Sequence, residues 1–342
     1  MTRAVNSLDL DSLQLYLEAK IEGFKGPISV EKFSGGQSNP TFKLTAETGV
    51  YVLRRQPPGK LLKSAHAVDR EYRVLKALAG TEVPVAKVHH LCEDTSIIGS
   101  MFYIMEYLEG RIYWDASLPE VNKADRAAIY DDMNRVLAAL HSVDIDAAGL
   151  KDYGKPGNYF QRQFDRWNSQ YRASEIEQIE AMEQLIRWLS TNLPDDDGRI
   201  ALVHGDYRLD NFMLHPTEPK AIAVLDWELS TLGHPFADLA YLCMQRRMPS
   251  IGAVKGLRGK DIQALGIPSE QEYIETYCQR MGIDKIENFS FYIAFSFFRL
   301  AAIIQGVAKR SLEGNASNAN ATELAGHVGP LAELALEAIE EG

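Results

Sequence analysis

Hydrophobic and polar residues alternate in short runs over the first third of the chain, a pattern typical of β-strands. We predict five strands in this part, at residues 28–33, 41–46, 51–55, 83–91 and 101–107. Apolar residues at helical spacing predict a helix over residues 8–22, ahead of the first strand. A second helix is predicted around residues 70–75. The N-terminal part is therefore expected to form a small antiparallel sheet accompanied by helices.

Beyond Gly110 the apolar residues recur at helical spacing, which predicts a mostly helical remainder. Helices are expected at residues 120–143, 160–171, 174–192, 269–281, 287–309 and 320–341. Four aromatic residues share one face of the second of these helices and are expected to pack in the core: Phe160, Phe164, Trp167 and Tyr171. Three arginines alternate with them and offer a contact to an anion: Arg162, Arg166 and Arg172. The most apolar segment, 289–308, contains Arg299 and Gln305, so we interpret it as a buried helix and not a membrane span.

Two short apolar runs, at residues 212–214 and 221–225, enclose a polar turn and predict an antiparallel hairpin. If Leu214 pairs with Ala223, Asn211 lies opposite Asp226, and opposed residues share one face at about 5 Å. An amide oxygen and a carboxylate at that spacing suit Mg²⁺, which takes one or two protein oxygens and completes its shell with water and phosphate. Asp206 precedes Asn211 on a loop and is free to accept a proton from a hydroxyl.

A polar, glycine-containing segment joins the first two strands and could present backbone N–H groups to phosphates. It consists of Ser34, Gly35, Gly36, Gln37, Ser38 and Asn39. Gly-Gly hairpin turns are common and usually only structural, so this segment by itself leaves both interpretations open. In the next strand, alternation places Val52 and Arg54 on one face and Leu53 and Arg55 on the other.

His204-Gly205-Asp206, followed by Asn211 and by a strand ending in Asp226, resembles the catalytic loop and metal-binding aspartate of the protein-kinase-like fold. The His-Gly-Asp sequence, with Gly where protein kinases have Arg, is similar to the motif of the aminoglycoside phosphotransferase and choline kinase branch of that fold. Residues 51–78 and 225–241 look most like the kinase domain attached to some acyl-CoA dehydrogenases. The resemblance implies an α+β, bilobal protein-kinase-like fold. Its nucleotide-binding lobe would span residues 1–107, and the mostly helical lobe with the catalytic loop and substrate site residues 108–342.

The same resemblance assigns roles to individual residues of the catalytic segment. Asp206 would be the catalytic base, and Asn211 and Asp226 would hold Mg²⁺. His204 would brace the loop, and Asp238 would anchor it from the following helix.

The resemblance also assigns the nucleotide site. Arg54 falls where the family has a basic residue, usually lysine, that reaches the ATP phosphates and pairs with a glutamate on the next helix. Glu71 is the expected partner, with a solvated helix carboxylate as the alternative interpretation. Backbone groups near Glu106 and Leu108 would bind adenine at the interlobe hinge. Further nucleotide contacts are expected from Ser34, Gly35, Gly36, Ser38, Asn39 and Val52.

Composition limits the classes of partner. The chain carries 36 Lys and Arg against 47 Asp and Glu, a net charge of −11, which argues against nucleic acid or an anionic membrane as the main partner. Its three cysteines are few, odd in number and scattered, which favours reduced thiols in a cytoplasmic protein over a disulfide framework. The N-terminus lacks the apolar core of a signal peptide.

The resemblance implies an ATP- and Mg²⁺-dependent kinase that acts on a hydroxyl of a small molecule, such as a hydroxyacyl-CoA or a hydroxy acid. An aminoglycoside 3'-type phosphotransferase and a non-catalytic nucleotide-binding pseudokinase are the alternatives. A phosphohydrolase with metal ligands among His204, Asp206, His215 and His234 is a further one, although their spacing matches no zinc pattern. His234 stands where family members often carry Asp, which leaves its role open. The choice between ATP and GTP and the oligomeric state are also left open.

Overall fold

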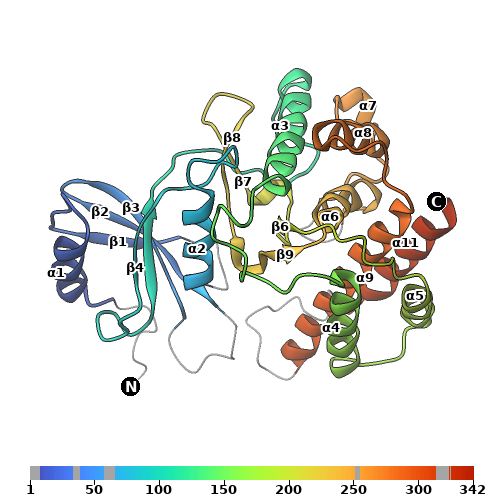
Figure 1. Cartoon of the computed structure of the whole chain (residues 1–342), viewed down its shortest axis with the longest axis horizontal. Coiled ribbons are helices and arrows are strands. Elements are labelled where there is room, and N and C mark those ends of the chain that lie inside the picture. Colours follow the sequence, from blue (N-terminus) through green and yellow to red (C-terminus); the bar gives the residue numbers. More distant parts are fainter. Residues whose placement is uncertain (1–7, 34–38, 58–65, 251–254, 313–322, 324) are drawn as a thin grey trace.

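A five-stranded antiparallel sheet forms one end of the molecule, at the left of Figure 1. The structure is a computed structural model that describes residues 8–33, 39–57, 66–250, 255–312, 323 and 325–342. The strand order is β1-β2-β3-β5-β4. The strands are β1 (Ser29–Lys32), β2 (Thr41–Ala46), β3 (Gly49–Arg55), β4 (Val88–Cys92) and β5 (Phe102–Glu106). The predicted strand at 83–91 is wrong over its first residues, where Pro84 has no backbone N–H to offer a ladder.

Alternation along β3 sends its side chains to two different cores. Leu53 packs with Leu13 and Leu17 of helix α1 (Leu10–Lys20), which covers the outer face of the sheet. Arg54 points to the opposite face, toward helix α2 (Val68–Leu78), whose apolar residues belong to the core of the larger lobe. The predicted division of β3 into two faces is therefore confirmed.

The larger lobe is built from helices around one central helix, α9 (Phe289–Leu312). Those that pack on α9 are α4 (Tyr159–Ala173), α5 (Glu180–Thr191), α6 (Phe236–Arg247) and α11 (Val328–Glu341). Further helices among the described residues of the larger lobe are α3 (Lys123–His141), α7 (Ile262–Leu265) and α8 (Glu270–Met281).

Helix α9 is long and apolar enough to cross a membrane, but 67% of its most apolar stretch is buried inside the fold. The aromatic face of α4 is buried against α9, as predicted from its spacing. The three cysteines, Cys92, Cys243 and Cys278, are buried and unpaired.

Two small antiparallel pairs lie between the sheet and the helices. β6 (Ala201–Val203) pairs with β9 (Thr231–Gly233), and β7 (Phe212–Leu214) pairs with β8 (Ala221–Val224). The second pair is the predicted hairpin. The first pair was not predicted, because strands of this length carry too little periodicity to be recognised from sequence.

The predicted register of the hairpin is wrong by one residue. Met213, and not Leu214, pairs with Ala223, and a bulge follows between Met213 and Leu214. The cause is a third segment: the backbone N–H and C=O of Leu214 both bond to Arg111, each at 2.8 Å, on the edge of β7 away from β8. Asn211 consequently lies opposite Leu225, whose N–H donates to the Asn211 carbonyl at 2.8 Å.

Candidate active site

The loop that carries Asp206 is held by one buried carboxylate. Asp238, in the first turn of α6 and only 1% exposed, accepts hydrogen bonds from the backbone N–H groups of His204 at 2.6 Å and Gly205 at 2.8 Å. His141 Nε2 lies 3.5 Å from the same carboxylate. Burial alone would raise the pKa of Asp238, but His141, His204 and the Gly205 N–H outweigh it, so this pKa is lowered. Asp238 therefore stays ionised and holds the backbone at the start of the loop, which is the place that the resemblance assigned to it.

His204 connects this loop to the end of strand β8. Its Nδ1 accepts the backbone N–H of Asp206 at 3.2 Å, so Nε2 carries the proton and donates to the Leu225 carbonyl at 2.8 Å. The ring also meets Trp227 edge-on, with centroids 4.8 Å apart. His204 thus joins the residue before Asp226 to the backbone of Asp206, which is the bracing geometry that was predicted for it.

Asp206 and Asn211 are brought together by the turn between them. The Asn211 amide Nδ2 donates to the Asp206 backbone carbonyl at 2.8 Å and to its carboxylate at 2.9 Å. This leaves the amide oxygen of Asn211 for a cation. Sequence reasoning missed Arg208, whose guanidinium contacts Asp206 at 3.2 Å and Asp210 at 3.0 Å. The sequence signal that could have identified Arg208 is its position as a basic residue between two aspartates of the loop.

Arg54 joins the small lobe to Asp226. Its guanidinium lies 2.7 Å from the Glu71 carboxylate and 2.8 Å from Asp226 Oδ1. Burial would lower the pKa of Arg54, but the charges of Glu71, Tyr103 and Asp226 hold it above its ordinary value. The predicted pairing of Arg54 with Glu71 is confirmed, and the alternative of a solvated helix carboxylate is wrong because Glu71 is 2% exposed.

Asp226 fits a magnesium ligand by its chemistry and its backbone. Its φ of 60° and ψ of 68° are left-handed, which is costly for a residue other than glycine and is characteristic of functional sites. This turn takes Asp226 out of the hairpin ladder, so its direction is set by the backbone turn and not by the pairing that was predicted. Its carboxylate and the Asn211 amide are hard oxygen donors of the kind that Mg²⁺ takes in small numbers beside phosphates.

The predicted nucleotide contacts are only partly within the described residues. Ser34, Gly35, Gly36 and Ser38 lie outside them. Asn39 is buried and donates to Glu71 at 2.7 Å, so its side chain supports the ion pair.

Val52 is buried in β3. The Glu106 N–H donates to the Lys87 carbonyl at 2.8 Å and is engaged there. The carbonyl of Glu106 and the backbone of Leu108 are left as the groups that could meet an adenine.

Helix α2 is fixed to the larger lobe by a residue that the sequence analysis overlooked. Arg70, next to Glu71, donates to the Tyr153 carbonyl at 2.7 Å and stacks 4.1 Å from the centroid of that ring. The Tyr153 hydroxyl in turn bonds to Ser230 at 2.7 Å, just before β9. Together with the Val224 N–H to Pro84 carbonyl bond at 2.8 Å, these contacts hold the two lobes in the arrangement that brings Arg54 to Asp226.

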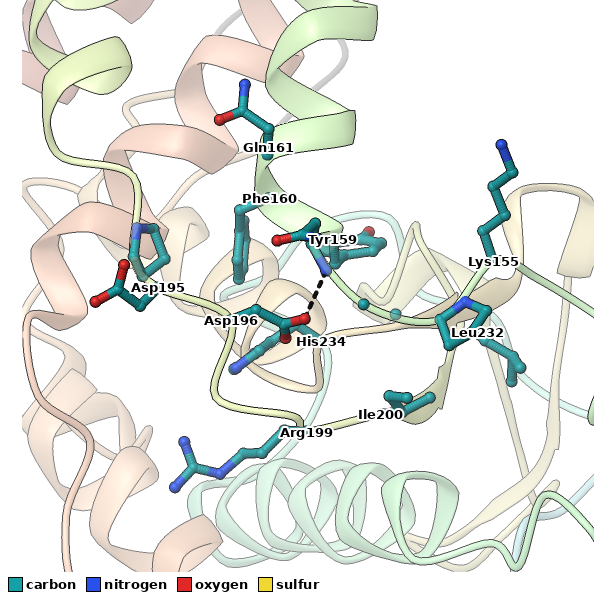
Figure 2. Close-up of a pocket in the computed structure, with 15 residues that line it drawn as sticks. Lys155, Tyr159, Phe160, Gln161, Asp195, Asp196, Arg199, Ile200, Leu232 and His234 are labelled. Atoms are coloured by element: carbon teal, nitrogen blue, oxygen red, sulfur yellow. Dashed lines mark hydrogen bonds between the residues drawn. The ribbon is translucent and has the colours of Figure 1, made fainter.

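His234 lies apart from this cluster. Since Ala201 pairs with Gly233 and Val203 with Thr231, His204 and His234 leave the β6–β9 pair at opposite ends. His234 lines a small hollow of about 30 Å³ between the start of α4 and residues 194–200 (Figure 2). Its Nε2 lies 3.3 Å from Asp197, and burial lowers its pKa.

The phosphohydrolase alternative needs clustered metal ligands. Within the described part of the chain, no group of three or more His, Cys, Asp and Glu could hold a metal ion. His215 is in the far turn of the hairpin, where Nδ1 meets the N–H of Glu218 at 3.1 Å. With His234 also separate from His204, the proposed ligands do not converge, and this alternative has no support.

The chain is similar to known proteins in sequence and in fold. The chain is 50% identical to mouse acyl-CoA dehydrogenase family member 10 over 99% of its own length and 32% of the relative's. It spans only 32% to 44% of the curated relatives that it matches. A crystal structure from Ralstonia eutropha JMP134, provisionally described as an aminoglycoside phosphotransferase, superposes with a TM-score of 0.90 and 51% identity, covering 98% of this chain and 99% of the other.

More distant structures share the fold. The ternary complex of APH(2")-IIa with streptomycin and ATP has a TM-score of 0.61 at 14% identity, covering 98% of this chain and 99% of the other. The bilobal, protein-kinase-like α+β fold is thereby confirmed. The profile of the phosphotransferase enzyme family matches residues 29–265. This protein therefore belongs to the phosphotransferase enzyme family that includes the aminoglycoside kinases.

Proposed function

We propose that this protein transfers the γ-phosphoryl group of ATP to a hydroxyl group of a small molecule. The observation that carries the proposal is that two parts of the structure, each fixed by hydrogen bonds or ion pairs, lie next to each other. One is the Asp206–Asn211 loop, fixed by Asp238, and the other is Asp226, held at 2.8 Å by Arg54 of the small lobe. Phosphoryl transfer requires little more of a protein than such positioning and charge stabilisation.

Each residue has a distinct task in this reaction. Asn211 and Asp226 would hold Mg²⁺, which would supply positive charge to offset that of the phosphates. Arg54, oriented by Glu71, binds the phosphates that are not transferred. Asp206 orients the acceptor hydroxyl and accepts its proton as the hydroxyl oxygen bonds to the γ-phosphorus and the bond from that phosphorus to ADP breaks. His204 and Asp238 contact neither reactant, and they hold the loop of Asp206 in its position.

The acceptor that we propose is a hydroxyacyl thioester or a hydroxy acid. The proposal is supported by relatives named as acyl-CoA dehydrogenase family members, whose lengths this chain covers only in part. The alternative acceptor is an aminoglycoside, because some structural neighbours are aminoglycoside kinases. Two of the three arginines of α4 do not help to decide between these acceptors, because Arg162 donates to backbone carbonyls and Arg172 is paired with Glu183.

Two variants test the proposal. Asp206→Asn should lose most turnover, by roughly 100-fold or more, while keeping Mg-ATP affinity. Asp226→Ala should weaken Mg-dependent nucleotide binding itself. Turnover is measured as ADP release with hydroxy acids, their CoA thioesters and aminoglycosides, and nucleotide binding by calorimetry with and without Mg²⁺.

The wild-type protein decides between the alternatives. A protein that binds Mg-ATP but consumes it with no acceptor of the panel would be the pseudokinase. Turnover with aminoglycosides alone would replace the proposed acceptor. Equal loss of affinity and turnover in both variants would remove the assigned roles.

A further inference from the structure

Side chains from the helices of the larger lobe pack around the loop that carries Asp206. Burial and the nearby charge of the Asp206 carboxylate raise the pKa of Tyr241 in α6, so this side chain lies close to Asp206. Behind it lies Arg299 of α9, whose guanidinium is centred 5.3 Å from the Tyr241 ring and 5.6 Å from the ring of Trp167 in α4. Arg299 Nη2 also donates to the carbonyl oxygen of Gly205, the residue before Asp206. Residues of three helices therefore place one cation against the backbone of Gly205, the residue that precedes Asp206.

Arg299, like Arg246, is a buried arginine that stacks on aromatic rings and has a guanidinium N–H group without a partner, but Arg299 contacts the backbone next to Asp206. It is only 9% exposed, and its Nε is buried without a hydrogen-bond partner. Within the described parts of the chain it forms no ion pair with a carboxylate. Arg126, another buried arginine, shows the contrast, since its guanidinium donates four hydrogen bonds to the backbone carbonyls of Leu118, Val121 and Leu265. Buried guanidinium groups are normally paired and fully hydrogen-bonded, so Arg299 is short of acceptor oxygens.

The nearby carboxylates are engaged elsewhere. Asp206 and Asp210 are both contacted by Arg208, and Asp238 is used by the loop backbone. Aromatic rings on two sides give Arg299 cation–π stabilisation but no hydrogen-bond acceptors. A ligand that reaches Asp206 could supply the missing oxygens, and a polycation would meet repulsion instead.

We propose that Arg299 binds the acyl oxygen of the acceptor, either the carboxylate of a hydroxy acid or the carbonyl of its thioester, and so directs the hydroxyl to Asp206. This inference rests on the proposed phosphotransferase function and identifies Arg299 as the residue that recognises the acceptor. A guanidinium can offer two parallel N–H groups to such a group, which an ammonium cannot. The acceptor is thereby held at both ends, by its acyl group and by its hydroxyl.

The test compares acceptors that differ only at the acyl end. The probes are straight-chain hydroxycarboxylates with the hydroxyl at increasing distances from the carboxylate, their CoA thioesters, and the diols in which the acyl carbon is reduced. In Arg299→Met, kcat/KM for acyl acceptors should fall roughly 10- to 100-fold, mainly through KM, while the diols are unaffected. Arg299→Lys should recover only part of the loss.

Arg166→Met is the matched control. It removes an exposed guanidinium that stacks 5.1 Å from the same Trp167 ring, and it should leave every acceptor unchanged. A loss confined to free acids assigns a carboxylate to Arg299, and a loss that includes thioesters assigns a carbonyl oxygen. Both results support the inference.

Equal losses for acyl acceptors and diols in Arg299→Met would overturn it, because Arg299 would then only support the loop. If the wild-type protein has the same kcat/KM for the diols as for the acids, the inference is also overturned, but the phosphotransferase function is not. Failure of the wild type to transfer phosphate to any acceptor would remove both.

Discussion

Replacement of Asp238 by asparagine tests how the catalytic loop is held. Asp238 accepts two backbone N–H groups, from His204 and Gly205, at 2.6 and 2.8 Å. Asparagine retains one acceptor oxygen, and its amide nitrogen must face the other N–H. The substitution therefore loses one charge-assisted hydrogen bond, leaves a buried donor unsatisfied and removes the charge beside His141.

The magnitude follows from the burial of this group. Losing a hydrogen bond to a charged group and leaving a buried donor unsatisfied costs about 2–4 kcal/mol in the free energy of unfolding. Unfolding entropies near 2.1 cal/mol/K per residue give ~0.7 kcal/mol/K for 342 residues, so Tm should fall by roughly 3–6 °C. Turnover should fall as well, because Gly205 directly precedes Asp206.

The pH dependence has a definite sign. The pKa of Asp238 is lower in the folded protein than in the unfolded chain. Its contribution to stability is therefore present above about pH 4 and is lost as pH falls through the lower folded pKa. The difference in Tm between the wild type and Asp238→Asn should narrow below about pH 4.

Tm is measured by differential scanning fluorimetry from pH 3 to 8, and turnover is measured by steady-state kinetics at neutral pH. The matched control is Asp196→Asn, since Asp196 also accepts a backbone N–H, from Asn158 at 2.9 Å, but is exposed. It should change the unfolding free energy by only about 0.5 kcal/mol and leave turnover intact. An Asp238→Asn protein with unaltered Tm and kcat would refute the anchoring role.

Two further predictions concern the same site. Gly205 has φ +84°, and an added Cβ would lie 2.7 Å from the Leu229 carbonyl, so Gly205→Ala should cost about 1–3 kcal/mol and lower kcat. Gly198→Ala, at φ +76° with open space around it, carries the backbone cost alone and is its control in thermal unfolding and kinetics; equal effects would contradict the steric argument. Arg54→Lys cannot span both of its carboxylate partners, so KM for ATP should rise several-fold in steady-state assays. Unchanged KM would show that the bridge seen here is not used with nucleotide.

The catalytic segment and the fold class could be predicted because the decisive information is local. Asp206, Asn211 and Asp226 are separated by short, fixed spacings, and the apolar periodicity distinguishes the sheet from the helices. The helix that supplies Glu71 and the strand that supplies Arg54 are also close in sequence. Their pairing needed only the alternation along one strand.

Other features depend on partners that are distant in sequence, and the tertiary structure decided them. The hairpin register was set by Arg111, which occupies the free edge of β7, and β6 and β9 acquire strand geometry only through each other. Arg70 and Arg299 look like ordinary helix arginines until folding places one against Tyr153 and the other against Gly205.

The chain by itself thus identified the candidate catalytic side chains, since their types and their spacings along the sequence are local features. Tertiary packing decided how these side chains are oriented. The loop around Asp206 takes its position from Asp238, His141 and Arg299, which lie on three different helices. The physical reason is that burying charged and polar groups is favourable only where complementary groups meet, and that meeting is a property of the whole fold.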